Sequence, residues 1–106
     1  MAVVCVECWA TWCGPCRQMF PHMSELARKY RARGFKVIGV TQEPMSANLK
    51  QFVASQGNNM DYSVAVDGDG DVQEKLMMPA GARGIPHAFL IDSQGIIRFS
   101  GHPAEP

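Results

Sequence analysis

The 106 residues are enough for one domain with a core of its own and too few for two. Hydrophobic residues make up 46% and charged residues 19%, the proportions of an ordinary globular protein. Ten basic and ten acidic residues balance, so the net charge favours neither nucleic acid nor an anionic membrane surface as a partner. No apolar run approaches the roughly 20 residues that a membrane-spanning helix needs.

The N-terminus carries no signal-peptide pattern, because Met1 leads almost directly into a strand-like run. If the natural protein is exported or anchored, that part lies outside this sequence. The compartment therefore stays open: cytoplasmic as written, periplasmic or membrane-anchored if a leader or anchor was trimmed.

Strands and helices alternate along the chain. Val3–Trp9 is predicted to be a buried central strand, and apolar residues at three- and four-residue steps predict a helix over 14–33 that Pro21 should kink. Phe35–Thr41 is predicted as a second strand, parallel to the first because a helix connects them. The remaining expected elements are a helix over 46–55 capped by Ser46, a strand over 62–66, a short helix over 71–78, and strands over 87–92 and 96–100 joined by a hairpin turn. This order predicts an α/β sandwich with a mixed sheet.

Two cysteines stand at the junction of the first strand and the first helix. Cys13 lies near the helix N-terminus and Cys16 one turn inside. Unpaired backbone N–H groups and the helix dipole stabilise an anion there, so we expect a depressed pKa for Cys13, which makes it the attacking sulfur. Cys16 is placed to resolve a mixed disulfide. Between them, Gly14 and Pro15 set the turn, and the fixed φ of Pro15 suits the first turn of a helix.

The segment 7–16 (Glu-Cys-Trp-Ala-Thr-Trp-Cys-Gly-Pro-Cys) closely resembles the active-site segment of thioredoxins. The segment 84–92 (Gly-Ile-Pro-His-Ala-Phe-Leu-Ile-Asp) resembles the cis-proline loop and the following strand of the same fold. Together with the segment 35–40, they resemble the TlpA/ResA-like, or redoxin, branch of thiol-disulfide oxidoreductases. The resemblance covers the chain from Val3 to about Gly101.

This resemblance implies that residues 1–106 form a single thioredoxin-like domain, a three-layer α/β/α sandwich with a mixed central sheet. The closing helix and the N-terminal hairpin common in this branch have no counterpart in the sequence, so the domain is expected to be either minimal or trimmed at both ends. A partly uncovered sheet face would favour lower stability or self-association. We therefore expect a monomer that self-associates weakly.

The resemblance also implies roles for residues around the cysteine pair. The bond before Pro86 should be cis, its loop should lie against the cysteines, and the backbone at Ile85 should pair with an extended substrate segment. Trp12 should pack beside Cys13 and form part of the docking surface with Gly14 and Pro15; the alternative is a purely structural Trp12. In this family a Gly-Pro dipeptide between the cysteines is typical of reducing members.

Glu7 is an acid in an otherwise apolar strand. Burying a carboxylate without a partner is costly, so the pKa of Glu7 should rise towards neutral pH. Glu7 also stands six residues before Cys13, where thioredoxins carry a buried acid that serves the resolving cysteine. The match implies that Glu7 accepts the proton of Cys16, directly or through a water. The alternative is a Glu exposed at a sheet edge or paired with a lysine such as Lys36.

Other polar or reactive residues receive simpler interpretations. Cys5 and Cys8 should point to opposite faces of their strand and pack as buried apolar residues, with a four-cysteine zinc site as the alternative. The segment 67–71 begins like an EF-hand loop but has Val72 where glycine is needed, which favours a polar turn that caps the next helix. His22 and His87 could lie near the active site, where tuning of the local field is favoured over a metal role. No metal site is expected.

The sequence therefore predicts a thiol-disulfide oxidoreductase, in the reducing direction, that works through the Cys13–Cys16 couple. Its redox carrier is this disulfide and no separate cofactor is expected. The expected partners are a disulfide-containing protein substrate and a thiol protein that donates electrons. The main alternative is a redox-sensing or metal-handling module that uses the same cysteines without turnover. A peroxidase ranks lower, because no threonine–cysteine motif of peroxiredoxins is evident.

Overall fold

A five-stranded mixed sheet organises the fold. The computed structural model describes residues 2–104, and the strands lie in the order β3-β2-β1-β4-β5. β1 pairs with β2 and β2 with β3 in parallel, whereas β4 runs antiparallel to both β1 and β5. The elements, in chain order, are β1 (Val3–Trp9), α1 (Gly14–Tyr30), η1 (Arg31–Arg33), β2 (Phe35–Thr41), α2 (Ala47–Gln56), η2 (Gly57–Met60), β3 (Ser63–Val66), η3 (Gln73–Met77), β4 (His87–Ile91) and β5 (Ile97–Gly101).

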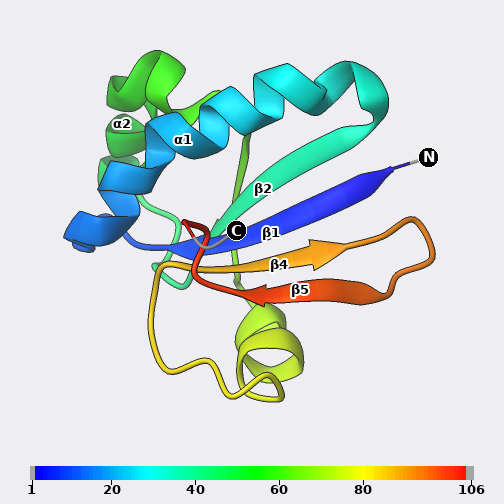
Figure 1. The fold of residues 1–106 in the computed structure, drawn as a ribbon. Helices are drawn as coiled ribbons and strands as arrows, with labels where there is room; N and C mark the ends of the chain where they lie inside the picture. Colours follow the sequence, from blue (N-terminus) through cyan, green and yellow to red (C-terminus); the bar gives the residue numbers. More distant parts are fainter. Residues whose placement is uncertain (1, 105–106) are drawn as a thin grey trace.

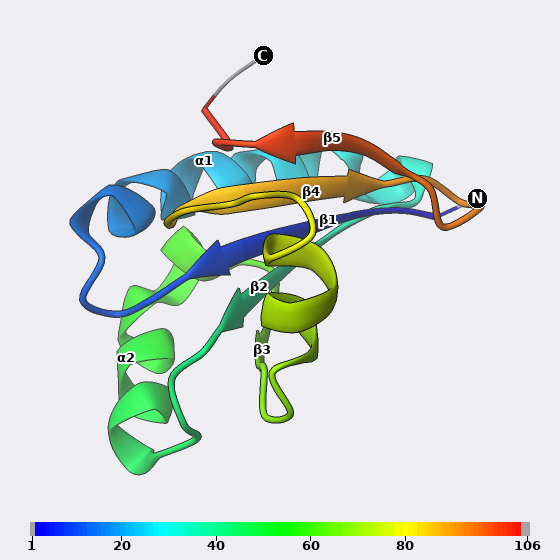
Figure 2. The same ribbon diagram turned by 90° about the horizontal axis from the view of Figure 1, so that it is seen from below.

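The helices cover the sheet on both faces. Figure 1 shows α1 and α2 on one side of the sheet and the segment around η3 on the other. The view from below in Figure 2 places η3 in front of β1 and β2, with α1 behind the sheet. The predicted three-layer α/β/α sandwich with a mixed central sheet is confirmed.

The bounds or type of several elements differ from the sequence prediction, and α2, β4 and β5 do so by one residue at one or both ends. The first α-helix continues through Pro21 but ends at Tyr30, because the chain tightens into the 3-10 turn η1. Gly34 then stops it with a left-handed φ of 86°, and its N–H donates to the Arg31 carbonyl. The short helix after residue 70 contains the wider π turn η3, in which the Met78 N–H reaches the Gln73 carbonyl. β3 begins at Ser63, so Tyr62 precedes the strand.

Alternate residues of β1 enter different layers of the core. Cys5 packs with Met23 and Ala27 of α1, whereas Cys8 packs with Met77 and Phe89 on the other face. Burial, reinforced by the nearby Glu7 carboxyl, raises the pKa of both thiols to about 12. Both are therefore unreactive packing residues on opposite faces of the sheet, as predicted.

The acidic segment 67–71 caps the helical turn that follows it. The Asp67 carboxylate accepts hydrogen bonds from the N–H groups of Val72 at 3.1 Å and Gln73 at 3.0 Å. This confirms the polar capping turn. Within residues 2–104, no group of three or more His, Cys, Asp or Glu side chains is arranged to hold a metal ion, and no helix is long and apolar enough to cross a membrane.

An apolar hollow of about 250 Å³ marks the part of the sheet that the helices leave open. It lies beside α1 where β4 and β5 are uncovered, and its lining includes Leu26, Leu90 and Phe99. This is the kind of partly uncovered sheet face that the sequence predicts. Weak self-association through it stays a prediction.

Candidate active site

The strand-to-helix junction positions the cysteine pair as the sequence predicts. After β1 ends, a tight turn forms in which the Cys13 N–H donates to the Ala10 carbonyl at 3.2 Å. Cys13 is extended (φ −91°, ψ 103°) and occupies the N-cap of α1, and Pro15 falls in the first helical turn. A proline fits there because the first N–H groups of a helix have no intrahelical partner.

Cys13 and Cys16 form a disulfide with a Cα–Cα distance of 5.2 Å. Cys13 is 5% exposed and Cys16 is completely buried, so only the first sulfur can be reached from solvent. The Cys16 N–H donates to Cys13 Sγ at 3.2 Å. After reduction, the same N–H and the N-terminus of α1 would stabilise a thiolate on Cys13.

The loop before β4 lies against this disulfide. The Ile85–Pro86 bond is cis, as the resemblance to thioredoxins implies. The Ile85 carbonyl oxygen lies 3.8 Å from Cys13 Sγ, although the two residues are 72 positions apart. Ile85 also packs against the core cluster that contains both cysteines. The fold thus brings the two motifs of the sequence face to face.

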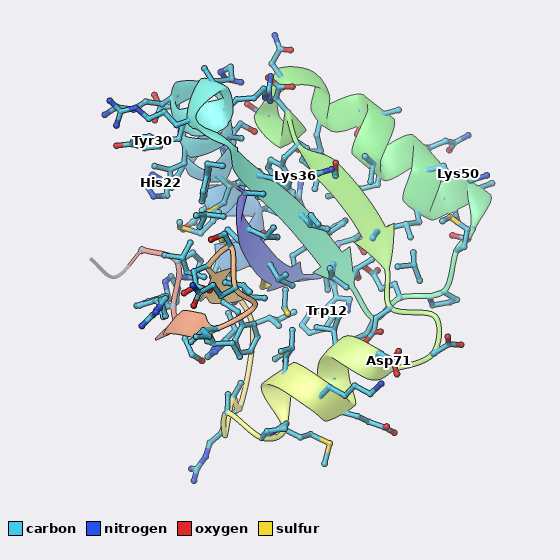
Figure 3. All side chains as sticks on the ribbon, turned by 90° about the vertical axis from the view of Figure 1, so that its right-hand side faces the viewer. Trp12, His22, Tyr30, Lys36, Lys50 and Asp71 are labelled. Atoms are coloured by element: carbon cyan, nitrogen blue, oxygen red, sulfur yellow. A yellow bond between two sulfur atoms is a disulfide. The ribbon has the colours of Figure 1, made fainter. Side chains whose placement is uncertain are left out.

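The surface beside Cys13 is open. Trp12 is 75% exposed, and Gly14 and Pro15 are exposed as well. A Cβ atom added to Gly14 would meet no atom within 4 Å, so there is room for an incoming chain at this position. His22, on the exposed side of α1, does not belong to this surface, and Figure 3 shows it well apart from Trp12.

Glu7 lies inside the molecule, on the sheet face that α1 covers. Its exposed fraction is zero, and burial raises the pKa of its carboxyl to about 8. The alternative of an edge-exposed or lysine-paired Glu7 is wrong. Lys36 is exposed and sits beside Val4 on the opposite face, whereas Glu7 sits beside Gly39. Glu7 is two residues before Trp9, which packs in the same cluster as Cys16.

Glu43 is a site residue that the sequence prediction missed. Its carboxylate accepts hydrogen bonds from the Thr11 N–H at 2.9 Å, the Thr11 hydroxyl at 2.5 Å and the Thr41 hydroxyl at 2.8 Å. Partial burial raises the pKa of this carboxyl, but the hydrogen bonds from Thr11 and Thr41 outweigh burial and hold it below its usual range. Glu43 thus fixes the turn that carries Trp12 and Cys13. The signal that could have found it is its place just after β2, where the carboxyl ends of parallel strands converge.

Comparison with known proteins agrees with this geometry. The model of the AhpC/TSA family matches residues 2–100. The thiol:disulfide interchange protein DsbE of Yersinia pestis is 35% identical over 96 residues, which cover 91% of this chain and 46% of that protein. The thiol-disulfide oxidoreductase ResA of Bacillus thuringiensis (strain Al Hakam) is 33% identical over 87 residues, which cover 82% of this chain and 47% of that protein. The chain therefore spans about half the length of the curated relatives it matches.

Solved structures share the fold. The crystal structure of a thiol:disulfide interchange protein of the thioredoxin family from Chlorobium tepidum TLS superposes with a TM-score of 0.78 at 27% identity. The match covers 99% of this chain and 70% of that one. Since the family model extends over almost the whole sequence, this chain belongs to the AhpC/TSA family, and its fold is thioredoxin-like.

Proposed function

We propose that the protein is a thiol-disulfide oxidoreductase that exchanges disulfides with a partner protein through Cys13 and Cys16. The observation that carries the proposal is the Cys13–Cys16 disulfide at the N-terminus of α1, with one sulfur near the surface and the other fully buried. Similarity to proteins named DsbE and ResA supports the same chemistry.

In the proposed reaction, the reduced protein transfers two electrons to its substrate. The Cys13 thiolate attacks one sulfur of the substrate disulfide, the substrate S–S bond breaks, and the departing substrate sulfur takes up a proton. Cys16 then gives its proton to Glu7 and attacks Cys13 Sγ. The Cys13–Cys16 disulfide forms and the second substrate thiolate leaves and is protonated by solvent.

Glu7 suits the role of proton acceptor because its pKa of about 8 lies close to the ordinary value of a thiol. A group with a matched pKa can take the proton and release it again near neutral pH. Because Cys16 is fully buried, an internal acceptor is needed on the same side of the sheet. Glu7 is the buried carboxylate on that face among the described residues.

Substrate binding is assigned to the open surface around Cys13. Trp12, Gly14 and Pro15 would contact the partner protein, and the backbone of Ile85, held by the cis bond to Pro86, would pair with an extended segment next to the attacked disulfide. A thiol protein would regenerate the reduced pair. The Gly-Pro dipeptide supports the reducing direction, and the disulfide itself serves as the only redox carrier in this scheme.

Insulin-disulfide reduction with dithiothreitol as the electron source tests the proposal. Cys13→Ser should abolish the reaction, and Cys16→Ser should trap a mixed disulfide with the substrate. Cys5→Ala, which removes a buried thiol outside the pair, is the matched control and should retain activity. Equal activity of wild type and Cys13→Ser would refute the proposal. Stoichiometric zinc or copper in the reduced protein, without turnover, would favour the alternative of a binding module.

A further inference from the structure

Four buried polar atoms in the core have no hydrogen-bond partner among the described residues. They are both carboxyl oxygens of Glu7, the indole nitrogen of Trp9 and the hydroxyl of Tyr62. Glu7 is 0% and Trp9 1% exposed, so bulk water does not reach these side chains. Buried polar atoms in native proteins nearly always have a partner. A group of four without one therefore points to a partner from outside the chain.

The three side chains that carry these atoms are arranged around Gly39, on the sheet face that α1 covers. Glu7 and Trp9 lie two residues apart on the same face of β1, and Gly39 sits beside Glu7 on β2. A Cβ atom added to Gly39 would be 2.9 Å from Tyr62 Cε1 and 3.1 Å from Trp9 Nε1. The two rings thus close over the glycine that neighbours Glu7. Tyr62 packs against both the cluster around Trp9 and the cluster around Cys5, so it bridges the two.

The chemistry of these groups defines what they can bind. The Trp9 indole N–H only donates, a protonated Glu7 donates once and accepts, and the Tyr62 hydroxyl does both. A water molecule donates twice and accepts twice, so it can take the Trp9 proton while it donates to Glu7. When Glu7 ionises, the water can donate to its carboxylate and accept from the Tyr62 hydroxyl.

The elements packed around Glu7 bring few other groups that could stabilise its ionised carboxylate. β2 and β4 place Gly39 and Ala88 beside it. The titratable side chains that the described elements bring to this face are Cys5 on β1, Cys16 on α1 and Tyr62 ahead of β3. Asp61, next to Tyr62, pairs at the surface with arginines of the α1–η1 segment. Within residues 2–104, the side-chain donors on this face besides the cysteines are thus Tyr62 and Trp9, and a bound water can link them to an ionised Glu7.

A cavity opens beside Tyr62 at the far end of α1. Tyr62 lines an open cavity of about 680 Å³ together with Ala27, Val37 and Met60. Trp9, Cys16 and Phe20, in the cluster that holds the disulfide, are at most 1% exposed, so bulk water does not enter the core through that cluster. Tyr62 therefore stands between the buried carboxyl and solvent.

We infer that Glu7, Trp9 and Tyr62 form a binding site for an internal water, through which the Tyr62 hydroxyl stabilises the ionised Glu7 carboxylate. This inference deepens the proposed function, because it rests on Glu7 as the proton acceptor of Cys16. Tyr62 is then a positioning residue: it acts through Glu7 and does not touch the reacting sulfurs.

The first test needs no variant. In the ¹⁵N-labelled wild-type protein, a cross-peak between water and the Trp9 indole N–H should show a long-lived contact. The Trp12 indole N–H, 75% exposed, serves as the surface control with only fast-exchanging water. Absence of a long-lived water at Trp9 would overturn the inference.

The second test measures Glu7 itself. In ¹³C-Glu-labelled protein, the carboxyl signal that disappears in Glu7→Gln is followed against pH. Tyr62→Phe keeps the ring and removes the hydroxyl, so the pKa of Glu7 should rise by at least about half a unit, or about threefold in proton affinity. Tyr30→Phe removes the chain's other tyrosine hydroxyl and should leave the titration unchanged.

An unchanged Glu7 titration in Tyr62→Phe would equally overturn the inference. Neither measurement uses the redox reaction, so the outcomes separate two failures. A long-lived water and a shifted Glu7, with no insulin reduction, would refute the proposed function alone. Insulin reduction by Cys13 and Cys16, with no such water or shift, would refute the role of Tyr62 alone.

Discussion

Glu7 should make the stability of the folded protein fall as pH rises. Its folded pKa of about 8 lies above the ordinary value of 4.5 that it has in the unfolded chain. The folded protein therefore binds this proton more tightly than the unfolded chain does. The stabilisation is fully present below the unfolded pKa and is lost as pH rises towards the folded pKa.

The size of this loss of stability follows from the interval between the unfolded and folded pKa values of Glu7. Each pH unit between the two pKa values changes the free energy of unfolding by about 1.4 kcal/mol, so the loss from pH 5 to pH 7 is on the order of 3 kcal/mol. That is a large share of the roughly 5–15 kcal/mol of a typical domain. Glu7→Gln keeps the shape of the side chain but cannot ionise. Its unfolding free energy should therefore lose this dependence on pH.

Urea unfolding of the oxidised protein at pH 5, 6, 7 and 8 measures the unfolding free energies of wild type and Glu7→Gln. The unfolding free energy of wild type minus that of Glu7→Gln should fall steadily as pH rises. Glu25→Gln changes an exposed carboxylate of α1 and is the matched control, with a pH dependence parallel to that of wild type. Parallel pH profiles of wild type and Glu7→Gln over this range would refute the reasoning, because they would mean that Glu7 ionises alike in both states.

Three further substitutions probe the elements that hold the site. Glu43→Gln leaves one carbonyl oxygen for the donors of Thr11 and Thr41, and should lower the unfolding free energy in urea by about 1–2 kcal/mol and slow insulin reduction. Unchanged values in both assays would contradict the role of Glu43. Gly39→Ala puts a Cβ 2.9 Å from the Tyr62 ring and should lower the unfolding free energy by about 1–3 kcal/mol, whereas a stabilised variant would show that the ring can move aside. Ser46→Ala removes the N-cap of α2 and should cost about 1 kcal/mol by thermal unfolding, so an unchanged melting temperature would speak against the cap.

The parts of the fold that the sequence predicts are those set by local patterns. The bounds of β1 and β2 follow from runs rich in strand-forming residues, with Gly34 ahead of β2 and Pro44 behind it. The cap at Ser46 is predicted because a serine just before a helix-like apolar pattern can accept a hydrogen bond from a backbone N–H of the first turn. Here the donor is the Leu49 N–H. The end of α1 is less well predicted, because no local pattern separates the 3-10 turn Arg31–Arg33 from a last turn of α-helix before Gly34.

The parts that the sequence does not predict depend on contacts between distant segments. Glu43 meets Thr11 across 32 positions, and only the parallel pairing of β1 with β2 brings them together. Tyr62 reaches the core from the residue before β3, where strand alternation gives no direction for a side chain. Its contact with Gly39 depends on how the loop after η2 approaches the sheet, a tertiary feature that no local pattern encodes.

Strand periodicity treats Cys5 and Glu7 alike, because both occupy the same face of β1 and both are buried. What separates them is the cost of burial. A thiol is buried as a small apolar group, whereas a carboxylate loses hydration that the surrounding chain does not replace. Glu7 lowers stability at neutral pH and lies next to the cluster that holds Cys13 and Cys16, and such a local conflict is expected of a functional position. The same conflict ties Glu7 to the proposed role of the disulfide, because the fully buried Cys16 sulfur needs a proton acceptor inside the core.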